Sequence, residues 1–141
     1  MSTPKHSVSV AGIVVNEDGR VLLIQRRDNR HWEPPGGVLE LSEAFEDGVR
    51  REVYEETGVA VTVDRLTGVY KNMERGIVAL VFYCRGGNKP APVTSEAVQV
   101  QWMTVEQARA VMAPAYHVRI TDALTPGVNV RVHDGINVLG A

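Results

Sequence analysis

Residues 51–58 read Arg-Glu-Val-Tyr-Glu-Glu-Thr-Gly, and this stretch decides how the rest of the chain is interpreted. Its glutamates, Glu52, Glu55 and Glu56, are spaced i, i+3 and i+4, so an α-helix would place them on one face. Gly58 suits the position just past a helix end. Glu55 and Glu56 would then lie in the last turn, where the helix dipole disfavours anions by roughly 0.3–1 kcal/mol each. A bound divalent cation is the simplest compensation, and carboxylate oxygens suit Mg²⁺ or Mn²⁺.

The flanking sequence extends the pattern over residues 37–59, which read Gly-x5-Glu-x7-Arg-Glu-Val-x-Glu-Glu-x-Gly-Val. Every fixed position of the Nudix box is filled, so the chain resembles the Nudix hydrolases, a family that includes the MutT-like enzymes. The preceding Trp-Glu-x-Pro-Gly-Gly of residues 32–37 and the segment 96–102 are also similar to the family. Together with the strand pattern, the resemblance covers most of residues 7–112.

The composition indicates one soluble globular domain over residues 1–141. The apolar fraction is 44% and the charged fraction 23%, which is ordinary for this class. The net charge of −2 argues against a nucleic acid polymer as partner, whereas a small phosphorylated ligand stays compatible because a metal can supply positive charge. The lone Cys84, the lack of an apolar signal core in residues 1–7 and the lack of a long apolar stretch favour a cytoplasmic protein without a membrane partner.

Alternating strand and helix patterns predict an α/β fold. Strands are expected at residues 8–15, 21–24, 59–69, 76–83 and 97–103. Helices are expected at 43–57, 104–112 and 116–124, with Ser42 as the first N-cap and Thr104 and Gln107 as a capping box. Residues 127–139 suit a terminal strand or arm. Strands mixed with helices suggest a mixed sheet covered on both faces. The resemblance implies the same architecture, a Nudix-type α/β/α sandwich with a mixed β-sheet flanked by helices.

Phe45, Val49 and Val53 recur every four residues and are expected to mark the buried side of the first helix. At roughly 100° per residue, the centre of the three glutamates lies about 70° from this stripe. The carboxylates are therefore expected to border the buried face, as residues that line a cleft do. The competing interpretation is a solvated acidic helix face, and the filled box and the helix dipole argue against it.

The resemblance implies Mg²⁺- or Mn²⁺-dependent hydrolysis of a pyrophosphate bond. This reaction requires charge neutralisation on the phosphates, activation of water and alignment of the two. Glu52, Glu55 and Glu56 are the expected metal ligands, and Glu55 and Glu56 are also catalytic candidates. Gly37 is expected at the metal and substrate site, where a close backbone approach requires glycine. Glu96 is a more distant candidate for the base, and its alternative is a solvated loop carboxylate.

Arg51 is the remaining catalytic candidate, because the resemblance suggests that it orients the glutamates through an ion pair with Glu43. Three further residues are candidates for substrate binding. Arg27 follows a predicted strand and could grip phosphates, Trp32 could stack on a base or simply pack, and Arg75 lies where a specificity loop could be.

The substrate class stays open at this level. A small nucleotide-type substrate is expected, either a nucleoside triphosphate, oxidised forms included, or a nucleoside diphosphate derivative such as a nucleotide sugar. The alternative functions are a catalytically inactive Nudix-like nucleotide-binding or regulatory domain and an isomerase acting on an isoprenoid diphosphate, and the intact box argues against both. Residues 127–139 could pair across a homodimer or form an edge strand within the chain.

Overall fold

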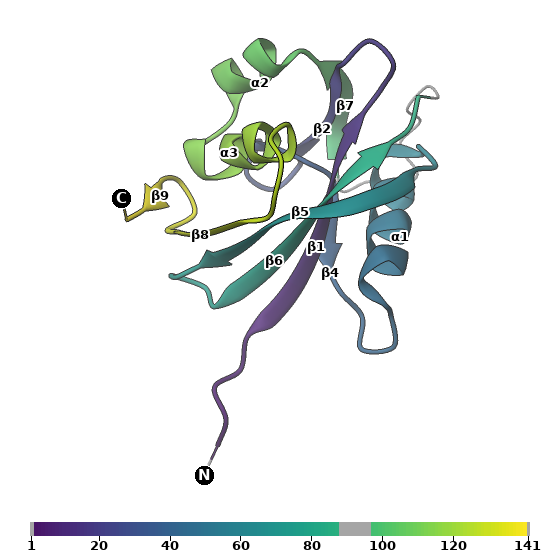
Figure 1. Ribbon diagram of the computed structural model, residues 1–141. Coiled ribbons are helices and arrows are strands. Elements are labelled where there is room, and N and C mark those ends of the chain that lie inside the picture. Colours follow the sequence, from purple (N-terminus) through teal and green to yellow (C-terminus); the bar gives the residue numbers. More distant parts are fainter. Residues whose placement is uncertain (1, 88–96, 141) are drawn as a thin grey trace.

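The computed structural model describes residues 2–87 and 97–140 (Figure 1). Its strands are β1 (Ser7–Val15), β2 (Val21–Arg26), β3 (Trp32–Glu33), β4 (Gly36–Val38), β5 (Thr62–Asn72), β6 (Ile77–Arg85), β7 (Ala97–Met103), β8 (Asn129–His133) and β9 (Val138–Leu139). Its helices are α1 (Phe45–Thr57), α2 (Val105–Val111) and α3 (Pro114–Ala123). Within these described ranges, no helix is long and apolar enough to cross a membrane.

Strand β1 lies inside one mixed sheet. It pairs in parallel with β6 and antiparallel with β2 and β4. Strand β5 pairs antiparallel with β6 and in parallel with β8, while β3 and β7 pair with β2 and β9 pairs with β8. Helix α1 covers one face of the sheet, and α2 and α3 cover the other (Figure 1). The predicted α/β/α arrangement around a mixed sheet is confirmed.

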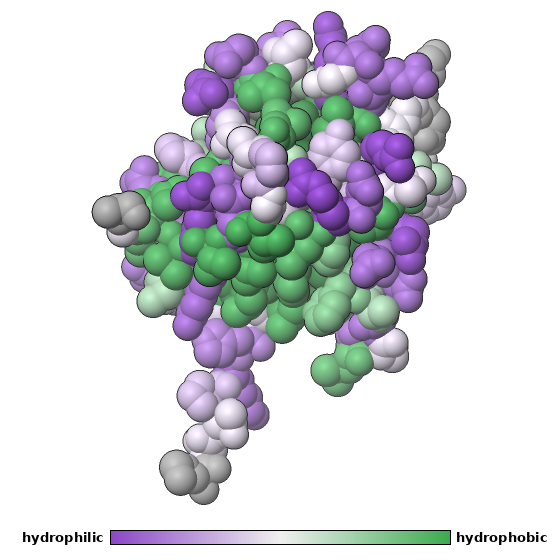
Figure 2. Space-filling model, in the orientation of Figure 1, coloured by the Kyte–Doolittle hydropathy of each residue, from purple (hydrophilic) through white to green (hydrophobic). Residues whose placement is uncertain are grey.

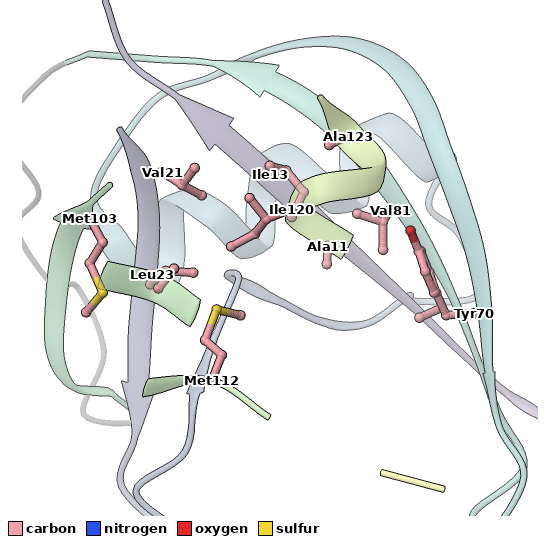
Figure 3. Packing of buried hydrophobic residues seen from close by; sticks show 12 residues of the cluster. Ala11, Ile13, Val21, Leu23, Tyr70, Val81, Met103, Met112, Ile120 and Ala123 are labelled. Carbon is pink, nitrogen blue, oxygen red and sulfur yellow. The ribbon is translucent and has the colours of Figure 1, made fainter. Parts of the chain in front are cut away.

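Two hydrophobic cores follow from the alternation of side chains along β1. Val10 belongs to the core under α1, where it packs in one cluster with Val53. Ile13 belongs to the core on the other face, together with Tyr70 of β5 and Ile120 of α3 (Figure 3). Each helix therefore buries its apolar side against a different face of the same strands.

Helix α1 begins later than the sequence pattern predicts. Its N-cap is Ala44, which makes no side-chain cap hydrogen bond, so the predicted N-cap Ser42 and the predicted start at Glu43 are wrong. The Glu43 N–H donates to the Glu40 carbonyl oxygen at 3.1 Å, and Glu43 Oε1 accepts from the Glu40 N–H at 3.0 Å. These two bonds form a turn ahead of the helix, so Glu43 is used there instead of in the first helical turn.

The buried stripe of α1 is shorter than predicted. Val49 and Val53 are fully buried, whereas Phe45 is 47% exposed. Phe45 is the first residue of the helix and lies outside the core that the two valines enter, so its assignment to the stripe is wrong. The helix ends as predicted at Gly58, whose φ of 72° is left-handed and whose N–H donates to the Tyr54 carbonyl.

The C-terminal residues complete the sheet within the same chain. Strand β8 pairs with β5 of the same chain. Of the two arrangements expected for residues 127–139, the structure therefore has the strand within the chain. Arg131 on β8 donates from Nε and Nη2 to the Asp122 carboxylate of α3, at 2.7 and 2.8 Å. The Tyr70 hydroxyl of β5 donates to the same carboxylate at 2.8 Å. One buried carboxylate therefore joins β5, β8 and α3.

Part of the outer surface is apolar. Figure 2 shows apolar residues gathered over the lower part of the molecule. Val130 of β8 is 79% exposed, and it pairs in register with Val69, which in turn pairs with Leu80. Residues in register on neighbouring strands lie on the same face, so these three side chains form an apolar row across β8, β5 and β6.

The capping box of α2 is present as predicted. Thr104 Oγ1 accepts from the Gln107 N–H at 3.1 Å, and the Gln107 side chain accepts from the Thr104 N–H at 2.9 Å. We expect Thr104→Ala to lower the free energy of unfolding by about 1 kcal/mol, because a helix N–H loses its acceptor. Urea denaturation measures this change. Thr104→Ser keeps the accepting hydroxyl and is the matched control, so equal stability of the two variants would contradict the prediction.

Candidate active site

Two glycines of β4 bring the sheet close to the C-terminal half of α1. Gly37 lies opposite Val10 of β1, and a Cβ atom at position 37 would lie 2.6 Å from the Glu52 carboxylate. The Gly36 N–H donates to Glu56 Oε1 at 3.2 Å. A side chain at position 37 would displace the Glu52 carboxylate from where it lies, so the backbone of β4 lies in direct contact with two of the predicted metal ligands.

Arg51 holds three carboxylates with one guanidinium. Its Nε and Nη2 donate to the two oxygens of Glu43 at 2.5 and 2.7 Å, which is a bidentate pair. Its Nη1 donates to Glu52 Oε1 at 3.0 Å and to Glu55 Oε2 at 3.2 Å. The ion pair with Glu43 that the resemblance implies is present, and Arg51 also contacts two of the three predicted metal ligands.

The cluster carries more negative than positive charge. Hydrogen bonds from Arg51 lower the pKa of Glu43 to about 2, so Glu43 is ionised at neutral pH. The same bonds raise the pKa of Arg51 above its usual range. The last turn of α1 contains no basic residue, although Glu55 and Glu56 lie there at the negative end of the helix dipole. A divalent cation beside these carboxylates would offset the excess charge.

The donor set suits Mg²⁺ or Mn²⁺, because both prefer oxygen ligands. The side chain of Glu52 is 12% exposed and that of Glu55 46%, while Glu56 is buried. In residues 2–87 and 97–140, no three acidic, histidine or cysteine side chains form a preformed metal cage. Mg²⁺ usually binds through one or two carboxylates together with waters and substrate phosphates, so the arrangement fits this ion. Glu96 lies outside the described residues.

A cleft of about 670 Å³ adjoins the two glycines, and its lining comes from β1, β4, α3 and the loops after β2, β5 and β8. Gly37 and Arg75, two of the predicted substrate residues, are part of the lining. Arg27 and Trp32, the other two, are not. Trp32 packs against the core on the α2 and α3 side, which matches its packing alternative, and Arg26 lies in the cleft wall where Arg27 was expected.

The cleft also contains residues that no sequence pattern singles out. Arg119 on α3 is 6% exposed, and its guanidinium carbon lies 4.9 Å from the Tyr70 ring centroid and 4.6 Å from that of Tyr116. Glu33 on β3 is part of the same lining, and burial raises its pKa. No spacing motif links these positions. The sequence shows Arg119 only as an arginine in a short predicted helix. Such residues usually face solvent, so nothing marked it as a cleft residue.

A family model, the NUDIX domain, matches residues 5–124 of the chain. The chain belongs to the Nudix family. A MutT-like protein of Streptomyces ambofaciens is 55% identical over 141 residues, which cover 99% of this chain and 92% of that relative. A Bacillus subtilis protein named provisionally as an 8-oxo-dGTP diphosphatase is 31% identical over 126 residues, covering 86% of this chain and 84% of that protein.

A solved structure is similar in fold. The Nudix hydrolase from Nitrosomonas europaea superposes with a TM-score of 0.78 at 20% identity, covering 94% of this chain and 82% of that one. The protein is therefore a Nudix hydrolase, in a family whose enzymes act on pyrophosphate bonds and generally use a divalent metal. The acidic cluster on α1 lies within the segment that carries the Nudix box.

The ion pair between Glu43 and Arg51 predicts how the stability of this Nudix hydrolase depends on pH. The pKa of Glu43 falls from its ordinary value of 4.5 to about 2 in the folded chain. Its stabilisation is therefore present above pH 4.5 and is lost as the pH falls towards 2. We expect the difference in unfolding free energy between the wild type and Glu43→Gln to shrink from pH 6 to pH 3. Urea denaturation at each pH measures it, and a constant difference would contradict the prediction.

Proposed function

We propose that this Nudix hydrolase cleaves a pyrophosphate bond in a nucleoside triphosphate or another nucleoside diphosphate derivative, with Mg²⁺ or Mn²⁺ as cofactor. The observation that carries the proposal is the excess of carboxylate charge at the end of α1. Glu52 and Glu56 contact the glycines of β4 there, beside a cleft of about 670 Å³. Clefts of this size commonly hold small molecules.

Glu52, Glu55 and Glu56 are the proposed metal ligands, with the backbone of Gly37 beside them. A divalent metal held there would neutralise charge on the phosphate oxygens and activate water for attack. Arg51 keeps Glu52 and Glu55 in position through its Nη1. The backbone N–H of Gly36 in β4 keeps Glu56 in position. These contacts fix the carboxylates before substrate arrives, which reduces the reorganisation needed during the reaction.

Glu55 is the proposed proton acceptor for the attacking water. Its side chain is 46% exposed, compared with 12% for Glu52, so water reaches it more easily. A carboxylate within hydrogen-bond reach of water can accept its proton. Glu96 is the second candidate for this role, as the sequence predicts, and Glu56 is better suited to ligand binding because it is buried against β4.

Nucleoside triphosphates are the first substrate class to test. The name of the Bacillus subtilis relative supports this choice and includes oxidised nucleotides, while nucleotide sugars are the next class. Arg75 and Gly37 are proposed substrate contacts because they line the cleft, and Arg27 and Trp32 stay predictions. A catalytically inactive nucleotide-binding domain is disfavoured because every box glutamate is retained. A cytoplasmic location, which the lone Cys84 favours, also stays a prediction.

We expect Glu55→Gln and Glu56→Gln each to reduce kcat by about 100-fold or more, because each loses a charge needed for metal binding or proton transfer. Phosphate or pyrophosphate release from a panel of nucleotides with Mg²⁺ measures this. Circular dichroism and thermal denaturation check that both variants fold.

The control for these variants is Glu106→Gln, which removes an exposed carboxylate on α2 and should leave turnover unchanged. Activity of the wild type should disappear with a chelator and return with Mg²⁺ or Mn²⁺. Near-normal turnover in both glutamine variants, or turnover that persists without metal, would contradict the assignment of Glu55 and Glu56 as metal ligands.

We also propose that two copies of the chain associate as a homodimer through the surface that includes residues 127–139. The apolar row of exposed Val130 and half-buried Val69 and Leu80 is the surface on which a second copy would pack, because apolar area left in water gains by burial. We expect sedimentation velocity at micromolar concentration to give a dimer for the wild type and a monomer for Val130→Glu. A wild-type monomer at every concentration would contradict the proposal without affecting the proposed reaction.

A further inference from the structure

Arg119 has hydrogen-bonding capacity that the described residues leave unused. It is 6% exposed, and its buried Nε has no hydrogen-bond partner within them. Its Nη2 lies 3.4 Å from Nε2 of His133. No carboxylate in the described part of the chain lies within 4.0 Å of its guanidinium, whose carbon lies over the rings of Tyr70 and Tyr116. A ring face attracts the cation but does not replace the oxygen acceptors that its N–H donors require.

A second buried charge on α3 is paired within the chain. Asp122 is 5% exposed, and its two oxygens accept from Arg131 and from the Tyr70 hydroxyl. A buried charge without a partner is costly, and an arginine cannot escape the cost by losing its proton. Arg119 lines the cleft, so a ligand in the cleft is the natural source of the acceptor that it requires.

The cleft lining indicates which kind of acceptor this is. Glu33 has a side chain that is 16% exposed, and only its Oε1 makes the 3.5 Å contact with Arg26. Asp28 and Asp134 are also part of the lining, together with Arg26 and Arg75, so its acidic and basic side chains offset each other and do not favour an anion over a neutral group. Ala79 and other apolar residues line the cleft as well. A flat neutral ring that carries both an acceptor and a donor fits this set best.

We propose that Arg119 and Glu33 bind the nucleobase of the substrate and select keto bases over amino bases. In guanine, hypoxanthine and uracil a carbonyl oxygen lies next to a ring N–H, so Arg119 can donate to the oxygen while Glu33 accepts from the N–H. Adenine and cytosine place an amino group and a ring lone pair at these positions, and both residues would then face groups of the wrong kind. This inference deepens the proposed function and rests on it.

The test compares keto and amino nucleotides in the full chain. We expect wild-type kcat/KM with Mg²⁺ to be about tenfold or more higher for GTP, ITP and UTP than for ATP and CTP. Arg119→Met should remove most of this preference, mainly through KM, and Arg119→Lys should keep part of it. Arg109→Met, on the exposed side of α2, is the matched control and should keep all of it. An equal loss for every nucleotide in Arg119→Met would overturn the proposal.

A second variant and a second readout cover the case in which Arg119→Met does not fold. Glu33→Gln keeps the shape of the cleft wall but replaces an acceptor by a group that also donates, so the preference should shift towards ATP and CTP. Calorimetry of GMP and AMP without metal should show the same order in binding. Absence of a preference in both assays, or no change in Glu33→Gln, overturns the inference. If no nucleotide is hydrolysed but GMP still binds better than AMP, the proposed function fails and the base selection stands.

Discussion

The arrangement of the carboxylates at the C-terminal end of α1 depends on the guanidinium of Arg51. Arg51 contacts Glu43, Glu52 and Glu55, and its Nη2 also donates to the Val38 carbonyl oxygen of β4 at 3.3 Å. Without it, carboxylates that share one helix face would repel each other and would also face the unfavourable end of the dipole. The same side chain therefore limits the repulsion, sets the directions of two carboxylates and attaches the helix to the strand that borders the cleft.

Glycines allow α1 to approach β4 and the segment that follows it. A Cβ atom at Gly37 would lie 2.6 Å from the Glu52 carboxylate, and one at Gly48 would lie 2.6 Å from Leu39 Cδ1. Gly48 lowers the helix propensity of α1 by about 1 kcal/mol relative to alanine, but it lets the segment after β4 pack against the helix. The missing side chains thus leave room for Glu52 and Leu39 as they lie, and the carboxylates depend on this room for their contact with the backbone of β4.

Local patterns predicted most of the fold, and long-range contacts account for what they missed. Strand β7 lies at the predicted residues 97–103, and the capping box at Thr104 follows from chemistry within a few residues. The start of α1 was missed because Glu43 bonds back to Glu40 in a turn ahead of the helix and also binds Arg51 eight positions later, an arrangement that no capping rule includes. The acidic cluster could be predicted because its members share one helix. The cleft wall could not, because Glu33, Arg119 and β8 meet only after the sheet has formed.

Arg51 and Arg119 show opposite uses of the same type of side chain. Arg51 has its donors directed to carboxylates of its own chain, so it acts as a structural centre. Arg119 is held by the faces of two tyrosine rings, which stabilise the cation without accepting its in-plane N–H bonds. Tyr70 makes the difference possible, because its ring covers Arg119 while its hydroxyl joins the Asp122 and Arg131 pair. Within the described cleft lining, Arg119 is thereby a buried cation with no carboxylate partner, and a donor held in this way discriminates between ligands better than a mobile surface arginine.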